Sequence, residues 1–157
     1  MIILGIDPGL SITGWGIVDM FSRDKISLIE YGCIKTTHST PLIQRLQNIN
    51  RELQFVINNY KPKAVAIEEL FFFKTSKSIV SLGEARGAII LTVSLNKIPL
   101  FEYNPKLVKI ALTGYGSADK RQIQYMVKTL LKLENMPTPD DAADALAIAI
   151  CHINSSI

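Results

Sequence analysis

The chain has 157 residues, of which 48% are hydrophobic and 20% charged, and its net charge is +3. No uncharged apolar run reaches the roughly 18 residues that a membrane-spanning helix needs, and Asp7 interrupts the first apolar run, which does not favour a signal peptide. The cysteines, Cys33 and Cys151, have the spacing neither of metal ligands nor of a disulfide framework. We therefore expect one domain over residues 1–157, in a cytoplasmic protein that does not contact a membrane.

Three strands are predicted before the first helix. Residues 2–7 form an apolar run, residues 12–20 follow the turn at Pro8 and Gly9, and residues 25–36 alternate loosely between apolar and polar positions. Between residues 41 and 59 the apolar side chains recur every three or four positions. This spacing predicts an amphipathic helix.

The second part of the chain alternates between helices and strands. Residues 63–68 have the continuous apolar character of a central strand, and 98–103 form a shorter strand. Helices are predicted over 76–95, 105–112, 119–132 and 139–153. Strands that alternate with helices pair in parallel through right-handed crossovers. The predicted fold class is α/β, a mixed five-stranded sheet flanked by helices.

Two acidic residues end predicted core strands. Asp7 follows the apolar run that ends at Ile6, and Glu68 follows the run that ends at Ile67. Sites in such sheets gather at the carboxyl ends of the parallel strands. Strand alternation places Glu68 on one face and Glu69 on the other, in solvent. An aspartate before Pro-Gly is also common in simple turns, so Asp7 has a structural explanation as well.

The segment "PTPDDAADALAIAIC", residues 137–151, adds two further candidates. Thr138 can cap a helix whose first residue is Pro139. For Asp140, the favourable position in the first turn is explanation enough. Asp144 lies among alanine, leucine and isoleucine, where a buried carboxylate without a partner is costly. Asp141 and Asp144 are three residues apart and so share a helix face.

A metal site would explain all four acids, Asp7, Glu68, Asp141 and Asp144. Clustered carboxylates repel one another unless hard cations lie between them, and oxygen ligands suit Mg²⁺, with Mn²⁺ as a substitute. Two such ions, about 4 Å apart, would stabilise the attacking water and the leaving oxygen of a phosphodiester. The pattern favours a metal-dependent nuclease.

The charge is unevenly distributed along the chain. Residues 70–132 contain ten Lys and Arg but three acidic residues, a net charge of +7, which leaves −4 for the rest. A basic segment set against an acidic one suits a polyanion whose phosphates meet metal ions held by acids. Scattered, solvated lysines are the alternative explanation.

Five motifs together resemble the RuvC family of Holliday-junction resolvases, in the family's order and spacing: "GIDPG" at 5–9, "AIEELFF" at 66–72, "GEARG" at 83–87, "TGYGSADK" at 113–120 and "DAADALAIA" at 141–149. The resemblance implies a ribonuclease-H-like fold, a homodimer, and Mg²⁺-dependent symmetric nicking of four-way DNA junctions, with the branch-migration proteins RuvA and RuvB as partners. It carries the catalytic role onto the same four acids, although the family admits His at the position of Asp141.

The resemblance also gives DNA-binding candidates: Phe71, Lys74, Lys77, Lys109, Lys120 and Arg121. Phe71 matches the family's base-stacking aromatic residue, and an exposed ring beside Lys74 and Lys77 can stack on an unpaired base while the lysines hold phosphate. For the adjacent rings of Phe72 and Phe73, the alternative is a hydrophobic plug beneath the loop. Lys109 and Lys120 match basic positions that the family places near the scissile phosphate. The loop before Lys120 and Arg121 leads into the N-terminus of a helix, and such a terminus can bind phosphate.

Other interpretations stay open. The helix at 76–95, with Gly83 and Gly87, could pack closely within the monomer or across a dimer. A nuclease of the same fold that processes ribosomal RNA precursors, or a junction-binding module without cleavage, would share several of these features. The phosphate loop of actin-like ATPases resembles "GIDPG", but those proteins need a second domain, for which 157 residues leave no room.

Overall fold

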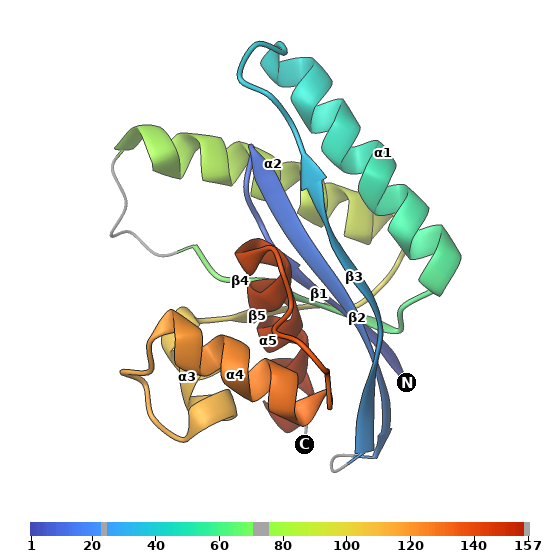
Figure 1. Ribbon diagram of the computed structural model, residues 1–157. Helices are drawn as coiled ribbons and strands as arrows, with labels where there is room; N and C mark the ends of the chain where they lie inside the picture. Colours follow the sequence, from blue (N-terminus) through green and yellow to red (C-terminus); the bar gives the residue numbers. More distant parts are fainter. Residues whose placement is uncertain (23–24, 71–75, 156–157) are drawn as a thin grey trace.

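The computed structural model describes residues 1–22, 25–70 and 76–155, which contain a five-stranded sheet of order β3-β2-β1-β4-β5 (Figure 1). β1 pairs antiparallel with β2, and β2 with β3, whereas β1, β4 and β5 are parallel. The mixed sheet predicted from the sequence, with its ribonuclease-H-like arrangement, is confirmed. The strands are β1 (Ile2–Asp7), β2 (Ile12–Ser22), β3 (Lys25–Lys35), β4 (Ala64–Glu68) and β5 (Leu100–Tyr103).

Helices cover both faces of the sheet (Figure 1). On one face lie α1 (Leu42–Tyr60) and α2 (Ser76–Leu95), and on the other lie α3 (Pro105–Thr113), α4 (Lys120–Leu130) and α5 (Asp140–Ser155). Each face has its own hydrophobic core. Leu4 and Ile6 of β1 pack with α1 and α2, whereas Ile3 packs with α5. Strand alternation therefore turns Asp7, like Ile3, toward α5.

Glycines allow α5 to lie directly on the sheet. A Cβ at Gly5 would overlap the carbonyl oxygen of Ala145, and a Cβ at Gly14 would overlap that of Asp141. Gly14 is also the residue that pairs with Asp7 across β1 and β2. The missing side chain at Gly14 thus lets the first turn of α5 settle beside the end of β1.

The predicted boundaries differ from the structure by at most two residues. One difference corrects the cap of α5: the carbonyl of Pro139 accepts hydrogen bonds from the N–H groups of Ala142 and Ala143, so Pro139 precedes the helix and Thr138 is not its cap. Asp119 likewise lies outside α4, where its carboxylate accepts from the N–H of Gln122 in a capping box.

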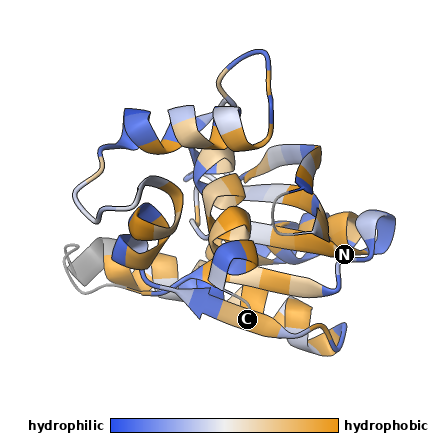
Figure 2. Ribbon diagram, turned by 90° about the horizontal axis from the view of Figure 1, so that it is seen from below, coloured by the Kyte–Doolittle hydropathy of each residue, from blue (hydrophilic) through white to orange (hydrophobic). Residues whose placement is uncertain are grey.

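Hydrophilic segments lie mainly at the periphery of the fold (Figure 2). Most residues of α5 are buried between the sheet and the helices α3 and α4. Within residues 1–22, 25–70 and 76–155, no helix combines the length and the apolar character needed to cross a membrane.

Candidate active site

The ends of two adjacent parallel strands carry Asp7 and Glu68. The register pairs Ile6 of β1 with Ile67 of β4, so the next residue on each strand is one of these acids. Both face α5, because Ile3 and Ala66, which precede them by even numbers of residues, pack against that helix. Glu69 is exposed. The predicted orientation of the two glutamates is confirmed.

The first two turns of α5 place Asp141 and Asp144 near the ends of β1 and β4, where Asp7 and Glu68 lie. Burial raises the pKa of Asp7 well above its usual range, and the negative charges of Glu68, Asp144 and Asp141 raise this pKa further, as does a hydrogen bond between Asp7 and Glu68. Each acid is thus close enough to act on Asp7, and the structure brings all four predicted site residues together. Within the described residues, however, no three His, Cys, Asp or Glu side chains converge closely enough to hold a metal ion.

Lys120 provides a positive charge at this cluster. Its Nζ lies 3.2 Å from Oδ2 of Asp144 and 3.3 Å from Oδ2 of Asp140, and Gln124 donates to Oδ1 of Asp140 at 2.8 Å. Burial raises the pKa of Asp144, and Lys120 offsets part of that rise. Burial acts to lower the pKa of Lys120, but Asp144 and Asp140 outweigh it, so the pKa lies above its usual value. The lysine stays charged and holds one carboxylate of the cluster.

A cavity of about 220 Å³ opens beside the acids. Lys109 and Lys120 line it together with Glu68 and Asp144, and its remaining walls are apolar. An open space bordered by both carboxylates and ammonium groups can receive a phosphodiester, whose oxygens the lysines would contact. The two lysines predicted near the scissile phosphate are therefore beside the acids.

Arg121, the third basic residue predicted to bind DNA near the site, does not line the cavity beside the acids. It is exposed and lines a separate groove of about 560 Å³ with Tyr115 and Tyr125, because consecutive residues of a helix point in different directions. Phe71, Lys74 and the side chain of Lys77 lie outside the residues and side chains that the structure describes.

Sequence reasoning missed two side chains that position the site. Arg86 of α2 donates from Nε to the backbone oxygen of Glu68 at 3.3 Å and forms an ion pair with Glu102, so it ties the end of β4 to its neighbours. Thr13 is buried and donates to the carbonyl of Gly9 at 2.7 Å, which fixes the turn after Asp7. Arg86 belongs to the "GEARG" motif, so its presence there was the available signal.

Comparisons with known proteins give a consistent result. The family model described as "Crossover junction endodeoxyribonuclease RuvC" matches residues 3–152. The protein of that name from Endomicrobium trichonymphae is 71% identical over 155 residues, which cover 99% of this chain and 82% of the relative. The one from Caldicellulosiruptor saccharolyticus is 52% identical over 156 residues, covering 99% and 94%.

Solved structures agree with the sequence comparisons. The structure of T. thermophilus RuvC in complex with Holliday junction substrate matches with a TM-score of 0.95 at 35% identity, over 99% of this chain and 94% of that chain. Family model, relatives and fold all coincide over nearly the whole length of the chain. The chain therefore belongs to the RuvC family of crossover junction endodeoxyribonucleases.

Proposed function

We propose that this chain resolves Holliday junctions by making symmetric paired nicks in four-way DNA. The observation that carries the proposal is that Glu68, Asp141 and Asp144 lie close enough to Asp7, at the carboxyl edge of the sheet, to act on its charge, in a member of this family. The cavity beside them, bordered by Lys109 and Lys120, provides the space for a phosphodiester.

The donor chemistry of the cluster fits divalent metal ions. Four carboxylates supply only oxygen ligands, and burial raises the pKa of Asp7, with the negative charges of the neighbouring acids raising it further. Asp7, Glu68, Asp141 and Asp144 would hold Mg²⁺, or Mn²⁺ in its place, with two ions per site. When bound, these ions would supply an activated water and stabilise the leaving oxygen. Lys120 contacts Oδ2 of Asp144, so Oδ1 would be the oxygen available to a metal ion, and the ammonium has further donors for the phosphate.

The chain's other candidates would bind DNA around this centre. Lys109 and Lys120 would contact non-bridging oxygens of the scissile phosphate from the cavity that they line. Arg121 would contact a phosphate from the neighbouring groove. Phe71, Lys74 and Lys77 are proposed on the family resemblance, as a stacking ring with two phosphate-binding lysines.

A homodimer is proposed through the outer side of α2. Ala85, Ile89 and Val93 bury one side of this helix, yet Val80, Leu91 and Leu95 on the other side are exposed. A helix that is apolar on all sides is normally buried on all sides, and an exposed apolar patch marks an interface. Apart from the adjacent residues and the backbone of its own helix, a Cβ at Gly83 or Gly87 would meet no atom of the described residues within 4 Å, which leaves room for a second helix. RuvA and RuvB are proposed partners on the family resemblance alone.

The test is to incubate the purified protein with a synthetic four-way DNA junction in Mg²⁺ and, separately, in Ca²⁺. We expect paired nicks at symmetric positions on two strands of like polarity, in Mg²⁺ only. Tight binding without nicks in Mg²⁺ would contradict cleavage and support a binding module. Preferential cutting of a structured RNA over the junction would support the alternative nuclease class.

A further inference from the structure

A polar groove of about 440 Å³ lies where the end of β3 meets the start of α1. Arg45 and Arg51 supply two positive charges to its lining, Lys35 borders it at the end of β3, and the other lining residues are threonine, glutamine and asparagine. None of the described residues that line it is acidic or hydrophobic. Small-molecule pockets are mostly apolar, and the cores of protein interfaces are rich in aromatic residues. Cationic and neutral hydrogen-bonding side chains in this combination are typical of contacts to a phosphate backbone.

Arg45 is a buried cation without a counter-ion among the described residues. Its side chain is 7% exposed, and it donates from Nε to Oγ1 of Thr36 at 2.8 Å and from Nη2 to Oγ of Ser11 at 3.1 Å. Both acceptors are neutral, and the ion pairs of the described residues do not include Arg45. A buried charge that has only neutral partners is costly unless an anion approaches it. The groove is therefore poised for a negatively charged ligand.

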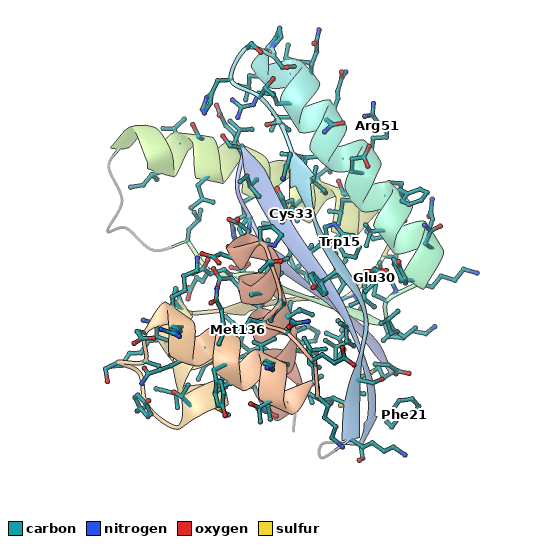
Figure 3. The ribbon with its side chains drawn as sticks, in the orientation of Figure 1. Trp15, Phe21, Glu30, Cys33, Arg51 and Met136 are labelled. Carbon is teal, nitrogen blue, oxygen red and sulfur yellow. The ribbon has the colours of Figure 1, made fainter. Side chains whose placement is uncertain are left out.

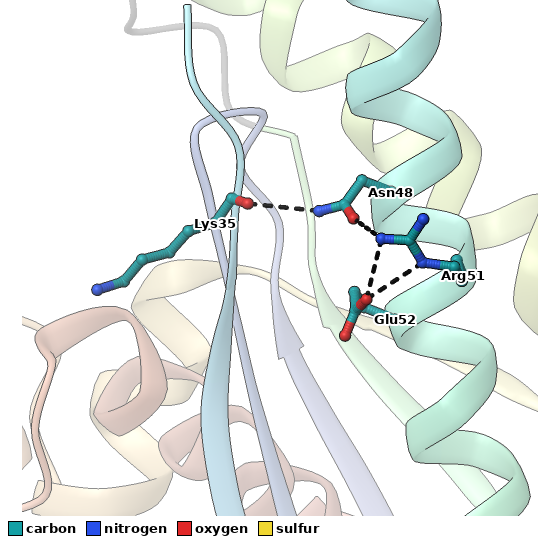
Figure 4. Close-up of polar contacts among 4 residues, drawn as sticks. All are labelled: Lys35, Asn48, Arg51 and Glu52. Atoms are coloured by element: carbon teal, nitrogen blue, oxygen red, sulfur yellow. Dashed lines mark hydrogen bonds and ion pairs between the residues drawn. The ribbon is translucent and has the colours of Figure 1, made fainter. Parts of the chain in front are cut away.

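The second arginine of the groove can change partners easily. Arg51 donates to Oδ1 of Asn48 and lies 3.3 Å from Oε1 of Glu52 (Figure 4). The side chain of Arg51 is 73% exposed, and an ion pair in solvent contributes little. Its guanidinium can thus exchange Glu52 for a phosphate at small cost.

Lys35 extends the positive charge toward the acids. Asn48 holds the carbonyl of Lys35 at 3.4 Å, while the lysine side chain leaves β3 on the side away from α1 (Figure 4). The register pairs Lys35 with Ile12 on β2, and Asp7 with Gly14 on the same strand. Strands lie about 4.8 Å apart and residues rise about 3.4 Å, so the Cα atoms of Lys35 and Asp7 are on the order of 12 Å apart. Measured along the axis of a duplex arm, that distance corresponds to roughly three or four base pairs, at about 3.4 Å each.

We propose that this groove binds the phosphodiester backbone of a junction arm, about three or four nucleotides from the scissile phosphate. The inference rests on the proposed function and adds a binding site to it. The basic segment found by charge counting began at residue 70, but residues 31–67 contain five Lys and Arg and one acidic residue. Two of those five, Arg45 and Arg51, line the groove, and a third, Lys35, borders it at the active-site end of the sheet.

The experiment measures junction binding in Ca²⁺ at several salt concentrations, and nicking in Mg²⁺, for three proteins. They are the wild type, the double variant Lys35→Ala/Arg51→Ala, and the control Lys25→Ala/Lys63→Ala, which removes two exposed lysines from the opposite end of the sheet. Each phosphate contact contributes about 0.9 to the salt slope, so the double variant should bind on the order of tenfold more weakly, with a slope lower by about two. The control should bind like the wild type.

A second arm uses junctions in which neutral methylphosphonates replace the phosphates three to five nucleotides from the cleavage position, on either its 5′ or its 3′ side. Methylphosphonates on one of the two sides should weaken junction binding by the wild type. They should not weaken binding by the double variant further, because it has already lost the same contacts. The proposal would be overturned if the binding losses from the methylphosphonates and from the double variant added fully, or if the double variant kept the salt slope of the wild type. A wild type that binds junctions but does not nick them in Mg²⁺ contradicts the proposed function alone; one that does not bind them contradicts both.

Discussion

Burial raises the pKa of Asp7 well above its usual range, and the negative charges of the neighbouring acids raise it further. Its raised pKa means that the folded state favours the protonated form, so Asp7 stabilises the metal-free fold below pH ~4 and this contribution is lost as the pH rises through the raised value. In EDTA the wild type should therefore lose stability between pH 4 and 7 relative to Asp7→Asn. Thermal unfolding of both proteins across this range measures the difference, and parallel curves would contradict the raised pKa of Asp7.

The same substitution should abolish cleavage without abolishing junction binding, because Asp7 is proposed to hold metal and not phosphate. Losing several kcal/mol of transition-state stabilisation lowers the rate by about a thousandfold or more. Mg²⁺ should raise the unfolding temperature of the wild type but not that of Asp7→Asn, because a ligand stabilises the state that binds it. Equal stabilisation of both proteins by Mg²⁺ would remove Asp7 from the ligand set.

Asp140 differs from its neighbours because it is exposed and contacts Lys120 and Gln124. The hydrogen bond from Gln124 lowers the pKa of Asp140, and Lys120 lowers it further. Exposed contacts of this kind contribute little, and Lys120 keeps its contact with Asp144, so Asp140→Asn should change the nicking rate by less than about threefold. The measurement compares the nicking rates of Asp140→Asn and Asp141→Asn. A loss of rate in Asp140→Asn as large as that in Asp141→Asn would make Asp140 the metal ligand in place of Asp141.

At the scale of elements, α5 must lie close to β2 for Asp141 to reach Asp7. A Cβ at Gly14 would overlap the backbone oxygen of Asp141, so Gly14→Ala should destabilise the fold by about 1–3 kcal/mol and reduce nicking. Gly116→Ala is the matched control, since its Cβ would meet only side-chain carbons of Lys106, which can move away. Denaturant unfolding of both variants measures the cost, and equal stabilities would argue against close packing at Gly14.

The elements themselves could be predicted from the sequence, because apolar runs and helical spacing are local properties of the chain. The same holds for Asp7 and Glu68, whose charge interrupts an apolar pattern. Contacts such as Lys120 with Asp144, or Arg45 with Ser11, join residues far apart in the sequence and depend on how the helices pack. No local pattern distinguishes Arg45 from a solvated cation, and the "GEARG" motif, which contains Arg86, does not show that this residue contacts Glu68. The role of the four acids as metal ligands stays a prediction.

At the scale of the whole molecule, paired nicking requires two active sites related by symmetry, which a single chain cannot provide. The outer side of α2 is the proposed contact, with Leu91 59% exposed among other apolar residues. Leu91→Asp places a charge there and should weaken the dimer by at least thirtyfold, about 2 kcal/mol. Phe21→Asp changes a residue of similar exposure at the far end of β2, away from α2, and should leave the dimer intact (Figure 3).

Sedimentation equilibrium gives the oligomeric state of both variants, and a junction carried on a supercoiled plasmid gives the coupling of the two nicks. We expect Leu91→Asp to be a monomer that leaves singly nicked circles, because the second strand must wait for another protein molecule. Phe21→Asp should linearise the plasmid as the wild type does. A monomeric Leu91→Asp that still makes both nicks within one binding event would show that symmetry is not what couples them, and a dimeric Leu91→Asp would place the interface elsewhere.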